Sequence, residues 1–136
     1  MSVSYGSYLR LAELLRLQVP LSEPEQHDEM LFIVVHQVYE LWFRLLLHEV
    51  DRSKAELSAN DLFGAIARFK RLRTVLKTLV SQLDILETMT PLSFLTFRDR
   101  LETASGFQSA QFRALEFVLG SKRPDMLAHY TDQAER

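Results

Sequence analysis

His36 lies in the middle of MLFIVVHQVYELWF (residues 30–43), one of the most apolar stretches of the 136-residue chain. Helical spacing would place Phe32, Tyr39 and Phe43 on the same face as this imidazole, with Trp42 close by. One interpretation is a core histidine that has found a hydrogen-bond partner. The other is a pocket for a flat apolar ligand, in which the imidazole is the hydrogen-bonding group. The residue types alone leave both open.

A second candidate site is the stretch RDRLETASGFQS (residues 98–109). Arg98, Arg100 and Ser105 bracket a glycine-containing loop that opens a helix, and arginine is the natural bidentate partner of a carboxylate. Backbone N–H groups at the helix start, together with a serine hydroxyl, can bind further polar atoms. The alternative is a surface arginine and a serine that only caps the helix.

The spacing of the histidines argues against a metal site built from this chain. The residues three positions before the four histidines are Pro24, Ile33, Leu45 and Met126. None is a carboxylate, so the Glu-x-x-His pairs of a di-iron bundle are missing. His48-Glu49 is not followed by the second histidine of a zincin motif. We therefore expect no metal-ligating residue, and we expect His129 to be an exposed residue of the C-terminal tail.

Composition and charge narrow the class of protein. The chain has no cysteine, which rules out disulfides and thiolate ligands for zinc, haem or iron–sulfur clusters. Its first residues, MSVSYGSYLRL, lack the pattern of a signal peptide. Residues 29–50 carry several charges, which favours a buried helix over a membrane span. We expect a cytoplasmic protein with no membrane partner.

A basic run on the expected third helix could suggest nucleic acid. It consists of Arg68, Lys70, Arg71, Arg73 and Lys77. The formal net charge is −2, and the one aromatic side chain within the run, Phe69, belongs to the apolar positions of the helix, so none is left to stack on bases. We interpret the run as a solvated outer face and expect no nucleic-acid partner.

The period of the apolar residues is helical throughout, and glycine and proline fall at segment edges. We expect a short amphipathic helix over 5–17, a long central helix from about 24 to 57, a third helix to about 89, and short helices over 91–101 and 110–120. Ser22 and Glu25 would form a capping box, Asn60 or Asp61 would cap the third helix, and Gly120 would end the last one. The fold class is all-α, a single-domain helical bundle with long antiparallel helices over residues 1–136.

The third helix carries an apolar stripe whose steps alternate between three and four residues. Its members are Leu62, Ile66, Phe69, Leu72, Leu76, Leu79, Leu83 and Leu86. Such a stripe is typical of the seam of an antiparallel helical pair.

Three collinear blocks resemble the tryptophan 2,3-dioxygenase family. They are YGSYLRLAELL, HDEMLFIVVHQVYELWFRLLLHE and LTFRDRLETASGFQSAQFRALEFVLG, and the likeness runs over about residues 5–122, leaving 123–136 as a tail. The resemblance implies an all-helical, haem-dependent homo-oligomer, a tetramer or dimer. It implies that L-tryptophan or a related indole amino acid reacts with O2 to give N-formylkynurenine, the opening step of tryptophan catabolism by the kynurenine pathway.

The resemblance also implies roles for individual residues. His36 would be the catalytic residue that hydrogen-bonds the indole N–H, Phe32 and Phe94 would pack around the substrate, and Arg98 would bind its carboxylate. The loop at Ser105 and Gly106 would lie over the haem, which Phe32 and His36 would also border. The N-terminal Tyr5, Tyr8 and Leu9 would reach into the pocket of a neighbouring subunit.

The chain departs from the family in its second half. There the family has its axial haem histidine and a threonine near the substrate ammonium, and His129 does not stand in that context. The chain is then a piece of a full enzyme, a naturally short relative, or a partner of a second chain that supplies the proximal half. The alternative function is a non-catalytic relative that keeps an indole or amino-acid pocket, or an oligomerisation surface, without haem.

Overall fold

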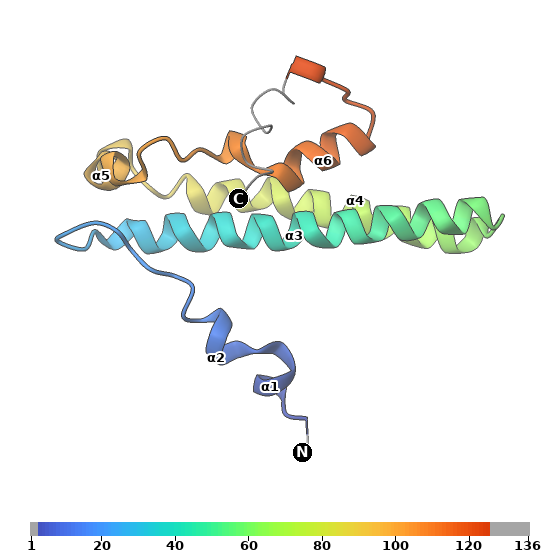
Figure 1. Cartoon of the computed structure of the whole chain (residues 1–136), viewed down its shortest axis with the longest axis horizontal. Helices are drawn as coiled ribbons and strands as arrows, with labels where there is room; N and C mark the ends of the chain where they lie inside the picture. Colours follow the sequence, from blue (N-terminus) through green and yellow to red (C-terminus); the bar gives the residue numbers. More distant parts are fainter. Residues whose placement is uncertain (1–2, 126–136) are drawn as a thin grey trace.

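The computed structural model describes residues 3–125, and within them every regular element is helical (Figure 1). The helices are α1 (Tyr5–Leu9), α2 (Leu11–Leu14), α3 (His27–Ser58), α4 (Leu62–Leu86), α5 (Pro91–Arg98) and α6 (Ala110–Val118), with 3-10 turns at Asp99–Leu101 and Gly106–Gln108. The all-α prediction is confirmed. His129 and most of the predicted tail lie outside the described residues.

The long helices α3 and α4 form an antiparallel pair (Figure 1). The chain reverses over residues 59–61, where Asn60 adopts a left-handed backbone with φ 58°. Asp61 then caps α4, because its Oδ1 accepts a hydrogen bond of 2.9 Å from the Gly64 N–H. Asp61 is one of the two caps predicted from the sequence.

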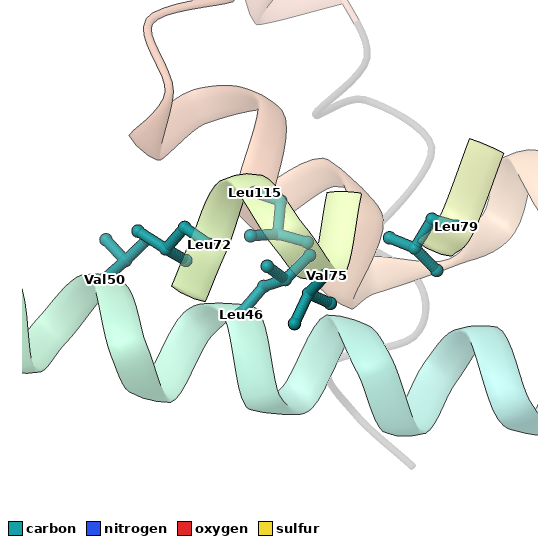
Figure 2. Close-up of a cluster of buried hydrophobic side chains, with 6 residues drawn as sticks. All are labelled: Leu46, Val50, Leu72, Val75, Leu79 and Leu115. Carbon is teal, nitrogen blue, oxygen red and sulfur yellow. The ribbon is translucent and has the colours of Figure 1, made fainter. Parts of the chain in front are cut away.

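The core forms where α6 crosses this pair. Figure 2 shows its side chains pointing toward one another from three helices: Leu46 and Val50, then Leu72, Val75 and Leu79, then Leu115. Burial of these groups provides the main driving force for holding α6 on the pair. Farther along, Thr90 caps α5 with Pro91 at its first position, and Phe97 of α5 is fully buried.

The predicted seam of α4 is wrong in part. Leu72 and Leu79 are buried, but their buried companions are Ala65 and Val75. Five other predicted members are exposed, namely Leu62, Ile66, Phe69, Leu76 and Leu83. The buried stripe lies on an adjacent face of α4, and alternating steps of three and four describe both faces equally well.

The N-terminal segment also differs from the prediction. The expected helix over 5–17 is broken at Arg10, whose φ of 52° ends α1 and begins α2. The predicted Ser22–Glu25 capping box is absent, and α3 begins at His27 behind Gln26, whose side chain makes no capping bond. The buried Ser22 hydroxyl donates a short hydrogen bond to Glu29 instead.

The interpretation of the basic run as a solvated face is wrong for Arg68, which is half-buried, while Arg71 is exposed and also makes an ion pair. Arg71 Nη1 lies 2.8 Å from Glu49 Oε1, and Arg68 Nη1 lies 3.5 Å from Glu49 Oε2. Glu49 is buried, so it requires these cations. Arg73 and Lys77 are exposed, as expected.

By length and composition alone, α3 could cross a membrane, a test that the central helix of a bundle also passes. Three of its glutamates are buried and find their partners inside the molecule. They are Glu29 with Ser22, Glu49 with Arg71, and Glu56 with Arg52. These pairings favour the predicted role of α3 as a central helix.

Candidate functional site

An aromatic wall made of Phe32, Phe94 and Phe97 lies on one side of His36 in the N-terminal half of α3. The His36 and Phe32 rings lie 4.1 Å apart between centroids, as expected for side chains one helical turn apart. Phe94 and Phe97 approach Phe32 from α5, with centroid distances of 5.7 and 5.6 Å. The cap at Thr90 sets the residue at which α5 begins. This position of α5 lets the rings of Phe94 and Phe97 reach Phe32 on α3.

A main-chain oxygen determines the tautomer of His36. The Nδ1 atom lies 2.7 Å from the carbonyl oxygen of Phe32. A carbonyl oxygen only accepts, so Nδ1 must carry the proton and donate it. In the neutral ring, Nε2 is then a hydrogen-bond acceptor, and no hydrogen bond to Nε2 is found among residues 3–125. The site therefore offers one acceptor beside an aromatic wall.

His36 also lines an open cleft of about 380 Å³ between α3 and the N-terminal segment. Leu14 and Leu17 form the outer wall, Leu41 of α3 adds apolar surface, and Gln111 of α6 closes one side. None of these four residues was predicted as part of the site. Leu14 and Leu17 reach α3 across a linker whose path has no local sequence signal, and Gln111 reaches it through the packing of α6.

Two glutamines hold that outer wall in place. Gln18 Nε2 donates to Gln37 Oε1 at 2.6 Å, and Gln37 Nε2 donates to the Leu17 carbonyl at 3.0 Å. Gln18 Nε2 also donates to the Leu14 carbonyl at 3.0 Å. Gln37, the residue after His36, therefore holds the segment of Leu14 and Leu17 against the cleft that His36 lines.

The structure places Arg98 at the end of α5, four residues after Phe94. The side chain is half-buried, and its Nη1 donates a 3.0 Å hydrogen bond to the Glu102 carbonyl. Glu102 has a φ of 49°, an uncommon conformation for a residue other than glycine. The guanidinium has five N–H donors, so this bond leaves others for a carboxylate.

Ser105 and Gly106 are exposed and begin the 3-10 turn that leads to α6. The Ser105 hydroxyl accepts from the Phe107 N–H at 3.3 Å, and the Ser105 N–H donates to Gln108 Oε1 at 3.2 Å. Ser105 is therefore a cap, as one of the two interpretations held. A Cβ added at Gly106 would meet no atom within 4 Å, so this backbone is open to approach.

The other aromatic residues predicted around His36 belong to the core side of α3. Tyr39 donates to the Leu79 carbonyl at 2.6 Å, and burial raises the pKa of its phenol. Phe43 packs on Tyr39 and on Phe112 of α6. Trp42 packs on the core cluster. Of the predicted neighbours, only Phe32 makes a ring contact with His36 among the described residues.

The remaining predicted site residues lie on α1, which projects away from the α3–α4 pair (Figure 1). Tyr5 and Tyr8 are each 76% exposed and Leu9 is 41% exposed. No described contact joins them to His36. Within residues 3–125, no three His, Cys, Asp or Glu side chains gather in a way that could hold a metal ion.

Comparisons with known proteins place the chain in a family. A family model described as "Tryptophan 2,3-dioxygenase" matches residues 1–135. Curated relatives of that name come from Herpetosiphon aurantiacus, at 57% identity over 95% of this chain, and from Anaeromyxobacter sp. strain K, also at 57% over 95%. A third, from Nocardioides sp., is 50% identical over 94%. These matches cover 50%, 48% and 49% of the relatives, so the chain spans about half the length of the curated relatives it matches.

Proposed function

The chain belongs to the tryptophan 2,3-dioxygenase family, and from this premise we propose that it forms the substrate-facing part of a haem-dependent dioxygenase. The reaction adds both atoms of O2 across the indole C2–C3 bond of L-tryptophan and yields N-formylkynurenine. The observation that carries the proposal is the free acceptor Nε2 of His36 beside the Phe32 and Phe94 rings.

In this proposal His36 and the aromatic wall orient the indole. The indole N–H is a donor only, so it pairs with Nε2 when Nδ1 is protonated. Phe32 and Phe94 pack against the faces and edges of the ring system. The reaction consumes no net proton or electron, since the product contains all the atoms of tryptophan and O2. The main contribution of these side chains to the reaction is then to orient the indole ring.

Arg98 and the following loop bind the amino-acid end of the substrate. The guanidinium is fixed at the end of α5 by its bond to the Glu102 carbonyl, and its remaining N–H groups pair with the carboxylate. Ser105 and Gly106 provide an exposed, sterically open backbone over the ligand. Tyr5, Tyr8 and Leu9 remain exposed and would complete the pocket of a second subunit in a homo-oligomer.

The side chains around His36 fit one side of a haem site. The aromatic wall and the single imidazole suit a flat, largely apolar cofactor and substrate, and Phe32, His36, Ser105 and Gly106 would border it. Haem, when bound, supplies the iron that activates O2. The axial ligand would come from the length of the relatives that this chain does not span.

A chimera tests the proposal. The chain is joined to the remaining length of the Herpetosiphon aurantiacus relative, and haem uptake and N-formylkynurenine formation are followed by absorbance. We expect a haem Soret band that shifts with L-tryptophan, and turnover that falls at least tenfold in His36→Ala and Arg98→Ala. A folded, haem-loaded chimera that neither shifts nor turns over would refute the proposal.

A non-catalytic function is the second candidate, because the His36 acceptor and the Arg98 donors could bind an amino acid without haem. The chain alone is titrated with haem and, separately, with L-tryptophan by calorimetry. Tryptophan binding that requires His36 and Arg98, in the absence of haem uptake and of chimera turnover, would favour an amino-acid-binding module.

A further inference from the structure

Arg113 of α6 is a buried cation that has no assigned part in the candidate site. It is 6% exposed, and among residues 3–125 it is the only lysine or arginine that is buried. Its Nη1 lies 2.5 Å from Oε2 of Glu116, three residues farther along the same helix. The guanidinium also lies over the Phe112 ring, 5.4 Å from the ring centroid. A buried charge requires partners, and the pair with Glu116 balances this one.

A second bond of Arg113 reaches the loop that precedes α6. Its Nη2 donates a 3.3 Å hydrogen bond to the Phe107 carbonyl, six residues earlier in the chain. Ser105 hydrogen-bonds within the loop itself, to Phe107 and to Gln108. Bonds between near neighbours in sequence set the shape of a turn, and they do not hold the turn against the rest of the molecule. The bond from Arg113 joins the turn to a buried side chain of α6.

Helix α6 is itself fixed relative to His36. Gln111 Nε2 donates to the main-chain oxygen of Glu40 at 2.9 Å and to its Oε2 at 2.8 Å. Glu40 lies one helical turn after His36 on α3. Two neighbouring side chains of α6 therefore contact different parts of the candidate site. Gln111 contacts the helix of His36, and Arg113 contacts the loop.

The guanidinium of Arg113 is suited to hold both of its partners at once. Its five N–H donors form a rigid, planar fork, so Nη1 can pair with Glu116 while Nη2 donates to the Phe107 carbonyl. A lysine ammonium is a compact point charge, which keeps the pair with Glu116 but does not reproduce the fork. Arg113→Lys therefore separates the charge of this residue from its contact with the loop.

From these contacts we propose that Arg113 is a positioning residue for the ligand. By holding the Phe107 carbonyl, it keeps the exposed backbone of Ser105 and Gly106 on the side of the site where the amino-acid end of the ligand binds. The inference rests on the proposed function for the role of this loop. Loss of the bond then weakens recognition of the carboxylate and ammonium groups and spares recognition of the indole ring.

A nitroxide label tests the contact in the chain alone, because the chain has no cysteine of its own. Ala104→Cys places the label in the loop, and Ala114→Cys places it on α6, both at exposed positions. Arg113→Lys should shorten the rotational correlation time of the loop label by about twofold or more and leave the α6 label unchanged. Arg71→Gln, which removes a different ion pair to a buried glutamate, is the matched control and should change neither label. Equal loop mobility in the two variants, or loosening of α6 as well, would overturn the proposal.

The chimera tests whether the position of the loop affects binding. Arg113→Lys should weaken L-tryptophan binding by about fivefold or more, measured by calorimetry. Binding of 3-methylindole, which lacks the amino-acid end, should change by less than about twofold. Arg71→Gln should leave both affinities unchanged. An equal loss for both ligands would show that Arg113 only supports the fold, and an unchanged affinity for L-tryptophan would also overturn the proposal.

A second variant keeps the test decisive if Arg113→Lys does not fold. Arg113→Met with Glu116→Leu replaces the pair by apolar side chains, an exchange that is often neutral or stabilising for a buried pair, and it removes the bond to Phe107. The same changes in loop mobility and binding are expected from it. An unsubstituted chimera that binds L-tryptophan without turnover would refute the proposed function, and the comparison of ligands would still decide the role of Arg113. An unsubstituted chimera that binds no L-tryptophan would overturn both.

Discussion

At the residue scale, a main-chain atom decides what His36 can do. The Phe32 carbonyl fixes the proton on Nδ1, so Nε2 is left as the hydrogen-bond acceptor of the neutral ring whatever the identity of the Phe32 side chain. The Phe32 ring has a separate role, because it packs on His36 and on the α5 rings. Phe32 therefore acts through two different groups: its carbonyl sets the hydrogen bonding of His36, and its ring shapes the aromatic wall.

Arg98 should distinguish ligands by their carboxylate. In the chimera, Arg98→Gln removes the charge-assisted pair and should weaken L-tryptophan binding by about 10- to 100-fold, the effect of about 1.5–3 kcal/mol. Binding of 3-methylindole, which lacks the carboxylate, should hardly change. Calorimetry measures both, and Arg100→Gln, an exposed neighbour, is the control. An equal loss for both ligands would show that Arg98 only supports the fold.

Glu29 should stabilise the fold in a pH-dependent way. Burial alone would raise the pKa of this carboxyl, but hydrogen bonds from the Leu21 N–H and from the hydroxyl and N–H of Ser22 hold the pKa below its ordinary value. A lowered folded pKa means that the stabilisation is present above the unfolded value of about 4.3. It is lost as the pH falls through the folded pKa.

Glu29→Gln should therefore lower the free energy of unfolding by about 1.5–3 kcal/mol at pH 7. The difference in the free energy of unfolding between Glu29→Gln and the unsubstituted chain should narrow below about pH 4. Urea denaturation across this range measures it, with exposed Glu25→Gln as the control. A gap that stays constant with pH would contradict the assigned role of the carboxylate.

At the element scale, the α3–α4 pair combines an apolar core with ion pairs beside it. Leu46 and Leu72 meet in the core, while farther along α3 the buried Glu49 pairs with Arg68 and Arg71. Apolar contacts tolerate sliding more readily than ion pairs do. The buried carboxylate therefore helps to fix how far the two helices overlap.

Arg71 and Arg73 test that role as a matched pair. Arg71→Ala leaves the buried Glu49 with only the longer contact to Arg68, and should lower the free energy of unfolding by about 1–2 kcal/mol, a figure reduced for the half-exposed guanidinium. Arg73→Ala removes an exposed cation and should change it by about 0.5 kcal/mol or less. Chemical denaturation of the chain alone compares them. Equal effects would show that Glu49 does not depend on Arg71.

Local signals predicted the elements well, and they predicted the contacts between elements less well. The caps at Asp61 and Thr90 and the end of α6 before Gly120 follow from short-range chemistry, and the structure has them. Ser22 was predicted to pair with Glu25 in a capping box. In the structure it hydrogen-bonds Glu29 instead, since the linker folds back over the first turns of α3. Such a path depends on tertiary contacts that no local pattern contains.

The face of α4 that packs on α3 could not be predicted from periodicity alone. Both apolar stripes of α4 have steps of three and four residues, so the side chains that α3 presents decide which stripe is buried. Glu49 and Glu56 on α3 draw Arg68 to the interface, and Phe69 is left outside.

The candidate site was partly predictable for a related reason. Phe32 and His36 are neighbours on one helix, so their spacing in the sequence predicts their contact. Leu14 and Leu17 reach the cleft only through tertiary folding of the N-terminal segment, which their spacing from His36 does not reveal.

At the scale of the whole molecule, the chain has a packed body and a separately attached N-terminal segment. The body is the α3–α4 pair with α6 and α5, and α1 and α2 project from it (Figure 1). The segment contacts the body through polar anchors, at Gln18 with Gln37 and at Leu21 and Ser22 with Glu29. Segments attached by few buried apolar contacts open with a lower free energy than the core does.

Loosening one anchor should therefore open the cleft wall and leave the body folded. Gln37→Ala removes the bonds to Gln18 and to the Leu17 carbonyl, so amide hydrogen exchange over residues 14–18 should accelerate by about 5- to 10-fold, the effect of about 1–1.5 kcal/mol. The free energy of global unfolding should change by about 0.5 kcal/mol or less. Exchange followed by mass spectrometry, with denaturation of the same sample, measures both. Faster exchange in α3 and α4 as well would mean that the segment and the body open as one unit.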